Sequence, residues 1–441
     1  MGKMKDKNRP ELHWKKYSMT SDNTLLLNST LEEKAMLVGR VGMELLSCGT
    51  GAWRVRDSMN KIASHLGLEC SVDIGLMSIS FNCFDSTSCV THTLSLTNTG
   101  VNTFKLYRLE RFVKRFETEC ENMTVAQMHA KLDEYDKLSP LYSPLILGLA
   151  AAFACGGFTF LLGGGIWEIL LAFAGAGTGN FIRSRLIRNH YNLFMIVAIS
   201  VSSACLTYAL LLRLLNLIFG LSLIHQAGYI CAMLFIIPGF PFITSGIDFA
   251  KLDLRSGIER LSYALAIVLV ASLCAWIMAL ILNLKPAPFE PLELKNWQLI
   301  IFRLIASFCG VFGFSIMFNS PLKLASIAAL IGSIANTMRL ELLQFASFPP
   351  AVAAFCGALL AGLLASIIKR KLSYPRISIT IPSIVIMVPG LYYYKGIYNL
   401  GSMALSESAS WLAAALLITL ALPFGLVAAR YLTDRTFRHG A

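Results

Sequence analysis

Two proline–glycine pairs interrupt long apolar runs of the sequence, and a polar side chain follows ten residues after each proline. Pro238-Gly239 precedes the carboxylate of Asp248, and Pro389-Gly390, 151 residues further on, precedes the amide of Asn399. Proline removes a backbone donor and clashes with the preceding turn, so neither run can continue as a regular helix. The freed backbone groups can bind the amino and carboxylate groups of a zwitterion. One interrupted helix in each half of a membrane chain therefore predicts a transporter's substrate site.

Three carboxylates are candidates for proton coupling. A charged side chain inside or beside a broken helix is costly and typically lines a substrate or proton path, which makes Asp248 the first candidate. The alternative for Asp248 is an interfacial position near Lys251. Glu168 and Glu341 are the next candidates, and the alternative for both is a solvated position at the end of a span. Asn399 cannot titrate, so of the two polar residues that follow the breaks only Asp248, in the first half, can bind a proton.

Two more motifs recur between the halves. Asn180-x-x-Arg183 matches Asn336-x-x-Arg339 at an offset of 156 residues, and a Cys-Gly-x-Phe-x-Phe motif that begins at Cys155 recurs at Cys309, at an offset of 154 residues. Three motifs in the same order at nearly one offset predict an internal repeat. Arginines at span ends are commonly snorkelling anchors, but their repetition favours gating or the binding of a carboxylate.

The composition is that of a membrane protein. Of 441 residues, 55% are hydrophobic and 15% are charged, against about 25% charged in ordinary soluble domains. Residues 1–140 hold 18 basic and 17 acidic residues, and the rest of the chain holds 20 and 9. The basic excess belongs to the membrane part, where positive cytoplasmic loops explain it better than nucleic-acid binding.

The sequence that precedes Pro140 predicts a soluble region. No signal peptide is recognisable and no apolar run long enough to insert precedes Leu141, so we expect a flexible tail at 1–28 and a cytosolic α+β domain at 29–139. Helical spacing predicts helices at 31–46, 53–66, 102–116 and 124–138, the last capped by Thr124, and alternation predicts strands at 70–74, 77–84 and 90–96.

The remainder predicts an α-helical polytopic membrane protein with ten spans. Two five-helix repeats, 140–284 and 297–433, are joined by a Pro-rich linker, 285–296, and followed by a cytosolic tail, 434–441. An odd number of spans per repeat places the halves in inverted orientation. The spans are expected at 142–162, 166–182, 192–212, 224–246, 258–283, 297–317, 323–340, 350–368, 377–399 and 409–430.

Charge placement predicts the orientation. With the N-terminus inside, the inner loops and tail hold fourteen Lys and Arg residues and the outer side holds six. The positive-inside rule then places both termini in the cytoplasm, in a cell (inner or cytoplasmic) membrane.

Motifs for catalysis, metal binding and nucleotide binding are missing from the sequence. There is no serine elbow, Walker loop or metal-binding helix. Cys83, Cys89 and His92 lie close together but lack a fourth ligand and suitable spacing, which favours ordinary thiols over a metal site. We therefore expect no enzyme, no metal and no cofactor, and an ATP-driven pump is disfavoured.

The segment VGRVGMELLSCGTGAWRVRD resembles the N-terminal domain of the threonine/serine exporter family. Gly49, Arg54, Val55 and Asp57 match that family's pattern, while Gly51-Ala52 replaces its usual Glu-Thr pair. The two Pro-Gly breaks fit the family's two membrane domains, and the resemblance covers about residues 31–433. It implies a cytoplasmic-membrane exporter of threonine and serine driven by the proton motive force.

Three functions remain open from the sequence. The first is a proton-coupled exporter of threonine, serine or a close analogue, whose partners are the amino acid, protons, the lipid bilayer and a possible second copy of the chain. The second is a channel, or a transporter of a different small solute, with the N-terminal domain as sensor. The third is a membrane-embedded hydrolase that uses Asp57 or His92.

Overall fold

The computed structural model describes residues 24–369 and 374–438 and divides into two compact units. The N-terminal unit holds residues up to Cys48, Ala52–Gly100 and Arg108–Ser139, and the helical unit holds Gly49–Gly51, Val101–Tyr107 and the chain from Pro140 onward. The expected tail at 1–28 lies outside the described residues as far as residue 23. The last part of that segment, Leu26–Asn28, forms a 3-10 helix in which Leu26 is buried.

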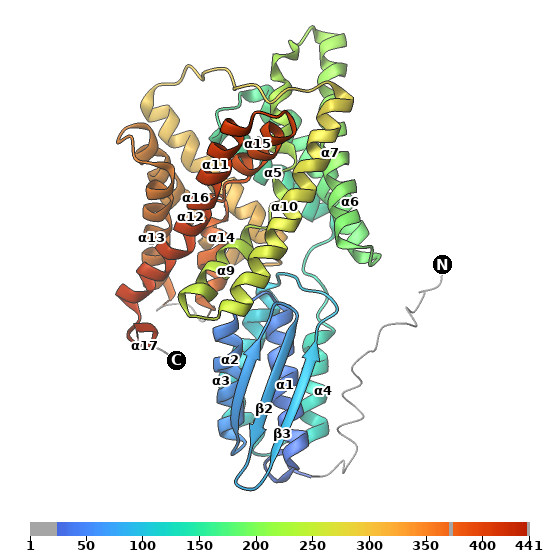
Figure 1. Ribbon diagram of the computed structural model, residues 1–441, viewed down its shortest axis with the longest axis vertical. Coiled ribbons are helices and arrows are strands. Elements are labelled where there is room, and N and C mark those ends of the chain that lie inside the picture. Colours follow the sequence, from blue (N-terminus) through green and yellow to red (C-terminus); the bar gives the residue numbers. More distant parts are fainter. Residues whose placement is uncertain (1–23, 370–373, 439–441) are drawn as a thin grey trace. The chain divides into compact units, whose positions relative to one another are not determined.

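The N-terminal unit is an α+β fold around one antiparallel sheet, as the sequence predicts (Figure 1). The sheet has the order β1-β2-β3, and β2 alternates buried and half-buried residues, which is typical of a sheet with one covered face. Thr124 caps the last helix, which confirms its predicted start. The elements are α1 (Leu31–Ser47), α2 (Ala52–His65), β1 (Glu69–Ile74), β2 (Ser78–Phe84), β3 (Cys89–Ser95), α3 (Thr103–Cys120) and α4 (Val125–Asp136).

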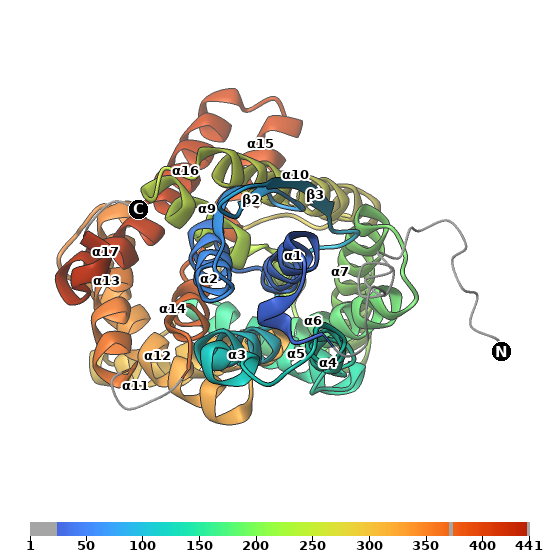
Figure 2. The ribbon, with the colours of Figure 1, turned by 90° about the horizontal axis from the view of Figure 1, so that it is seen from below.

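The helical unit contains long helices and two interrupted segments. Figure 2 shows α5 and α11 on one side of this unit and α10 and α16 on the other. Its elements are α5 (Pro144–Leu161), α6 (Ile166–Arg188), α7 (Leu193–Phe219), η3 (Leu223–Gly228), α8 (Tyr229–Ala232), η4 (Leu234–Ile236), α9 (Gly239–Ala250), α10 (Leu254–Leu282), α11 (Asn296–Met317), α12 (Leu322–Gln344), α13 (Pro350–Lys369), α14 (Arg376–Val385), α15 (Gly390–Gly401), α16 (Leu405–Thr433) and α17 (Arg435–Arg438).

Several of these helices are long and apolar enough to cross a bilayer. Within the described parts of the chain there are seven, and two bent pairs raise the number to nine if each pair is one span. The pairs are Leu223–Ile236 with Gly239–Ala250, bent by 55°, and Arg376–Val385 with Gly390–Gly401, bent by 49°. α6 covers the predicted second span but is not among the nine. The chain is therefore a membrane protein, and the predicted second span, 166–182, stays a prediction.

The elements around the breaks recur at the offset that separates the two prolines. α9 and α15 are both 12 residues long, α10 and α16 are both 29 residues long, and the members of each pair begin at this same offset. The residues that turn the chain between them, Leu252 and Met403, have φ of 60° and 59°. A left-handed backbone at a non-glycine residue is uncommon, so its recurrence at the same offset marks equivalent turns.

The first helices of each half correspond at the slightly larger offset of the Asn-x-x-Arg motifs. α6 and α12 are both 23 residues long and begin at this offset. After α5, the amide of Gly163 donates to the carbonyl of Phe160 at 2.9 Å, and after α11 the amide of Asn319 donates to Ile316 at 2.9 Å. The Cys-Gly-x-Phe-x-Phe motif predicts an offset of 154 residues between α5 and α11, which is two residues too short. The motif misleads because phenylalanines stand at every second position in both motifs, so a shift by two still aligns one pair.

α5 and α11 cross each other through glycine. A β-carbon on Gly157 would lie 2.5 Å from the carbonyl oxygen of Ala306, and one on Gly313 would overlap the carbonyl oxygen of Ala150. The offset of the Asn-x-x-Arg motifs also relates both members of the second contact to the corresponding members of the first. Small residues allow such close approach between membrane helices, and here the approach is reciprocal.

Candidate functional site

The two breaks adopt the same backbone conformation. Pro238 has φ −81° and ψ 63°, and Pro389 has φ −82° and ψ 54°. In each break the amide of the glycine donates to the carbonyl of the residue that precedes the proline. Gly239 donates to Ile237 at 2.8 Å, and Gly390 donates to Val388 at 2.9 Å. This is the geometry of an inverse γ-turn. In both places a new helix starts directly at the glycine.

The two breaks also contact each other. A β-carbon on Gly239 would overlap a methyl group of Val385, and one on Gly390 would lie 2.9 Å from Ile237 and 3.0 Å from Leu234. Each glycine thus packs on the segment that precedes the other break. Segments from the two halves of the sequence therefore meet at one place inside the helical unit.

Aromatic side chains join the segments on either side of the breaks. Tyr394, one turn into α15, and Tyr229 on α8 are fully buried and hydrogen-bonded to each other through their hydroxyl groups. Phe242 on α9 stacks on Tyr393 at 5.5 Å between ring centroids, and the Tyr393 hydroxyl lies 3.0 Å from Thr419 Oγ1. These contacts connect α8 and α9 of the first half to α15 and α16 of the second.

Asp248 is fully buried near the end of α9 and forms an ion pair with an arginine. Its Oδ2 lies 3.0 Å from Arg260 Nε and accepts a hydrogen bond from Ser256 Oγ at 2.8 Å. The other nitrogens of Arg260 donate to the backbone carbonyls of Gly49 at 3.3 Å and Thr50 at 2.7 Å. Buried charges need such partners, and the pair ties α9 to α10.

The second half does not repeat this ion pair. Asn399 is half-buried at the position equivalent to Asp248, and Glu407 and Trp411 stand at the positions equivalent to Ser256 and Arg260. Lys395 lies over the Trp411 ring at 4.6 Å. The C-terminal ends of α9 and α15 therefore differ in chemistry although their backbones correspond.

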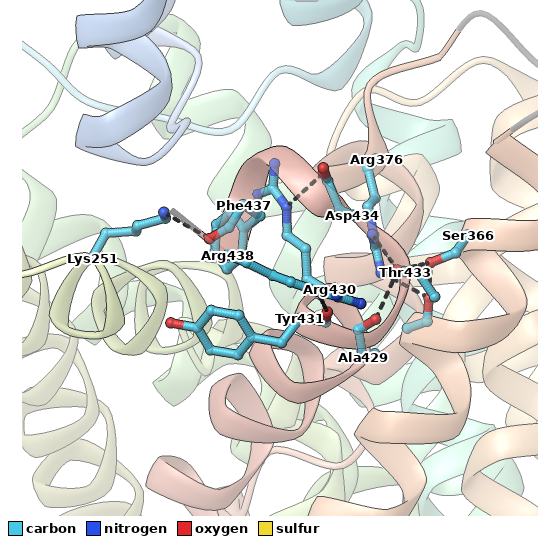
Figure 3. Close-up of polar contacts among 11 residues, drawn as sticks. Lys251, Ser366, Arg376, Ala429, Arg430, Tyr431, Thr433, Asp434, Phe437 and Arg438 are labelled. Carbon is cyan, nitrogen blue, oxygen red and sulfur yellow. Dashed lines mark hydrogen bonds and ion pairs between the residues drawn. The ribbon is translucent and has the colours of Figure 1, made fainter. Parts of the chain in front are cut away.

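Lys251 is engaged by the C-terminal end of α16 and the short helix α17, shown in Figure 3. Its ammonium group donates to the Phe437 carbonyl at 3.2 Å, and both Lys251 and Arg430 lie over the Phe437 ring, at 4.0 and 3.9 Å. Arg430 also pairs with Asp434 at 3.4 Å. These contacts fasten the end of the first broken helix to the C-terminal helices.

The repeated Asn-x-x-Arg motifs have the same internal hydrogen bond. Arg183 donates to Asn180 Oδ1 at 3.4 Å, and Arg339 donates to Asn336 Oδ1 at 3.0 Å. Each asparagine amide also reaches the neighbouring helix, a carbonyl of α5 at 2.6 Å and a serine hydroxyl of α11 at 2.8 Å. The motif thus locks α6 to α5 and α12 to α11 and orients its arginine.

The two remaining candidate carboxylates have different partners. Glu341 pairs with Arg303 at 2.7 Å between Oε1 and Nη1. Glu168, only 4% exposed, has its Oε1 2.7 Å from Nδ1 of His225. Sequence reasoning missed His225 and Arg260 as partners. The available signal for His225 was an imidazole inside the predicted fourth span.

The N-terminal motif residues do not form one site. Gly49, with φ of 82°, turns the chain before α2 and belongs to the helical unit, which explains the need for glycine. Arg54 forms an ion pair with Glu110 of α3, and Asp57 pairs with Lys61 one turn along α2 at 2.7 Å. Arg54 and Asp57 thus stabilise helices of the N-terminal unit. Within the described residues, no group of His, Cys, Asp and Glu side chains could hold a metal ion.

Comparisons with known proteins find family models that match most of the chain. A family model described as "Putative threonine/serine exporter" matches residues 36–283, and one described as "Threonine/Serine exporter, ThrE" matches residues 303–432. The "Threonine/serine exporter" of Corynebacterium glutamicum is 24% identical over 382 residues, 82% of this chain and 74% of that protein. The "Probable succinate transporter subunit YjjP" of Escherichia coli (strain K12) is 24% identical over 232 residues, 50% of this chain and 84% of that protein. No solved structure matches the chain.

Proposed function

Since the chain belongs to the threonine/serine exporter family, we propose that it is a secondary active transporter that exports threonine, serine or a similar small amino acid in exchange for protons. The observation that carries the proposal is the reciprocal packing of Pro238-Gly239 and Pro389-Gly390. Paired broken helices are where secondary transporters bind their substrates.

The breaks offer groups that suit an amino acid. α9 and α15 each begin at a break, and the amides of a first helical turn, at the positive end of the helix dipole, attract a carboxylate. Backbone carbonyls at the ends of the preceding segments suit an ammonium group. The hydroxyl of Tyr394, one turn into α15, and that of its partner Tyr229 suit the hydroxyl of threonine or serine.

Asp248 and Asn399 belong to a different level of the proposed path. They stand nine residues after Gly239 and Gly390, which is about 14 Å along a helix axis. We assign the Asp248–Arg260 pair to holding α9 on α10 while the substrate binds at the breaks. The transported proton then binds at a carboxylate of the helical unit, for which Asp248, Glu168 and Glu341 are the candidates.

The proposed architecture is two inverted repeats of five spans, with α6 as the second span. The equal lengths of α6 and α12 and of α10 and α16 support this reading, as do the reciprocal contacts of α5 with α11. Export would follow from a movement of one set of helices relative to the other around the breaks. The charge distribution supports cytoplasmic termini in the cell membrane, as the sequence predicts.

A dicarboxylate is the second candidate substrate. It is favoured by the similarity to the Escherichia coli protein named "Probable succinate transporter subunit YjjP". The two breaks present two helix N-termini, which equally suit the two carboxylates of such a substrate.

Counterflow in proteoliposomes tests the proposal. The purified full chain is reconstituted with unlabelled threonine inside and labelled threonine outside. We expect labelled threonine to enter against its gradient, serine to compete, and an inside-acid pH gradient to drive uptake. Counterflow of succinate without threonine would instead establish the second candidate. A flux that does not saturate and ignores the pH gradient would identify a channel and overturn the proposal.

A further inference from the structure

The three candidate carboxylates differ in the chemistry of their partners. Asp248 is paired with Arg260 and Glu341 with Arg303, whereas Glu168 is paired with His225. Arginine does not give up its proton in proteins, so protonation of its carboxylate partner strands a positive charge. Histidine exchanges its proton near neutral pH. Among these pairs, only Glu168 and His225 can gain or lose a proton without stranding an arginine.

The geometry allows this exchange with little rearrangement. The ring nitrogen Nδ1 faces Glu168 Oε1 at 2.7 Å, so it donates to the carboxylate while a proton binds or leaves at Nε2. The His225 side chain is 15% exposed, and its carbonyl accepts a hydrogen bond from the Tyr208 hydroxyl at 2.5 Å. The imidazole is thus fixed toward the carboxylate but is not sealed off.

The second oxygen of Glu168 is unusual. Oε2 is buried and has no hydrogen-bond partner within the described residues, and a β-carbon on Gly165 would lie 3.1 Å from it. An unpaired buried carboxylate oxygen is costly and calls for an explanation. A proton that the pair takes up and releases provides one.

Side chains from several helices surround the pair, and the ammonium group of Lys395 on α15 acts on Cys231. Tyr208 faces Glu168 from α7 and Cys231 faces it from α8, and α5 contributes the Thr159 hydroxyl beside Cys231. Among the described residues, His225 is the only ionisable partner within hydrogen-bond distance of the Glu168 carboxylate.

The pair has no counterpart in the second half. The offset of 156 residues between α6 and α12 places Leu324 at the position equivalent to Glu168. The offset of 151 residues between the two breaks places Arg376 at the position equivalent to His225. Leu324 is buried, and Arg376 donates instead to Thr433 at 3.1 Å. The fold does not require an ionisable pair here, because the corresponding helices are built without one.

The pair lies where it can act on the first break. His225 belongs to the segment Leu223–Ile236, which ends two residues before Pro238, and Glu168 lies in the first turn of α6. We propose that Glu168 and His225 form one proton-binding site per chain, whose occupancy changes the attachment of the first broken segment to α6. Its role in coupling rests on the proposed export function, whereas proton binding itself does not.

Infrared pH-difference spectra of the purified full chain test proton binding directly. We expect the wild-type spectra to contain one carboxyl and one imidazole component that are missing from both Glu168→Gln and His225→Gln. Both components should remain in the control Glu407→Gln, whose side chain is exposed. A variant counts as folded if it elutes as a single symmetric peak. The second variant keeps the test valid if the first one misfolds. Unchanged titration bands in a folded Glu168→Gln or His225→Gln protein would overturn the site.

Transport measurements then distinguish a failure of the proton site from a failure of the proposed export function. For one proton per threonine, a gradient of one pH unit supports about a tenfold threonine gradient. We expect the wild type to reach this value, and Glu168→Gln to show threonine counterflow but no accumulation above onefold. Full accumulation by Glu168→Gln would contradict the coupling. Absence of threonine movement in the wild type would refute the export function, while the spectra still decide the proton site.

Discussion

Gly239 packs on Val385 so closely that a β-carbon on the glycine would overlap a valine methyl group. The reverse contact joins Gly390 to Leu234, and the offset between the two prolines relates one contact to the other. Each break is therefore held in place by the segment in front of the other. A substitution at one glycine therefore disturbs the packing of both breaks, which makes the two breaks a single structural unit.

Alanine at Gly239 is expected to force the breaks apart. Overpacking of this kind costs about 1–3 kcal/mol, so the full chain should unfold at a lower temperature. Removing the opposing methyl groups with Val385→Ala should restore part of the loss in the double variant, because the clash is pairwise. Thermal unfolding of the purified chain measures both effects.

Gly100→Ala is the matched control for this substitution. Gly100 has open space where the β-carbon would lie, so its replacement should leave the unfolding temperature unchanged. Equal effects of Gly239→Ala with and without Val385→Ala would contradict the close contact.

The buried ion pair of Asp248 and Arg260 predicts a second non-additive result. Asp248→Asn or Arg260→Met alone leaves a buried charge without its partner, which costs about 3–5 kcal/mol. The double variant removes both charges and should lose less than the sum of the single losses. Chemical or thermal unfolding of the three variants gives the coupling energy.

Asp57→Asn serves as the comparison for an exposed pair. Asp57 and Lys61 are roughly half exposed, and such pairs contribute about 0–1 kcal/mol. If Asp248→Asn destabilised the chain no more than Asp57→Asn, the buried pair would not hold α9 to α10.

His129 predicts a pH dependence of the N-terminal unit. Burial, aided by the charge of Arg40 at 3.1 Å, lowers the pKa of His129 from 6.5 to about 4. The unfolded chain therefore binds more protons between these values, so stability rises with pH from about 4 to about 6.5 and is lost on acidification. The contribution is up to about 3 kcal/mol. Hydrogen exchange of α1 and α4, corrected for intrinsic rates, measures it.

His129→Gln should remove this part of the pH dependence, and His65→Gln should not. His65 is about one-third exposed and lies 3.9 Å from Glu117. A pH profile that is the same in the wild type and in His129→Gln would show that another group controls the acid sensitivity.

Local chemistry made the breaks and helix ends predictable from the sequence. Proline and glycine act on their own turn, so the positions of Pro238 and Pro389 follow directly, and the hydroxyl of Thr124 marks a helix start. The second span, predicted at 166–182, is less clearly apolar than the others, because α6 carries Glu168 and Arg183.

Partners distant in the sequence could not be predicted in the same way. Glu168 and His225 are 57 residues apart, and Arg260 reaches the Thr50 carbonyl across 210 residues. Such contacts depend on how helices pack, which no local pattern encodes. Aromatic residues at alternate positions also made the offset between α5 and α11 ambiguous by two positions.

Equilibrium binding of labelled threonine to purified protein tests the central claim, that the two breaks form one substrate site. It should be measured for Gly239→Ala, Gly390→Ala, the double variant and Gly100→Ala. We expect both single variants to lose threonine affinity by similar factors, the double variant to lose little more than either, and Gly100→Ala to bind as the wild type does. Wild-type affinity in a folded Gly239→Ala or Gly390→Ala protein would contradict a shared site.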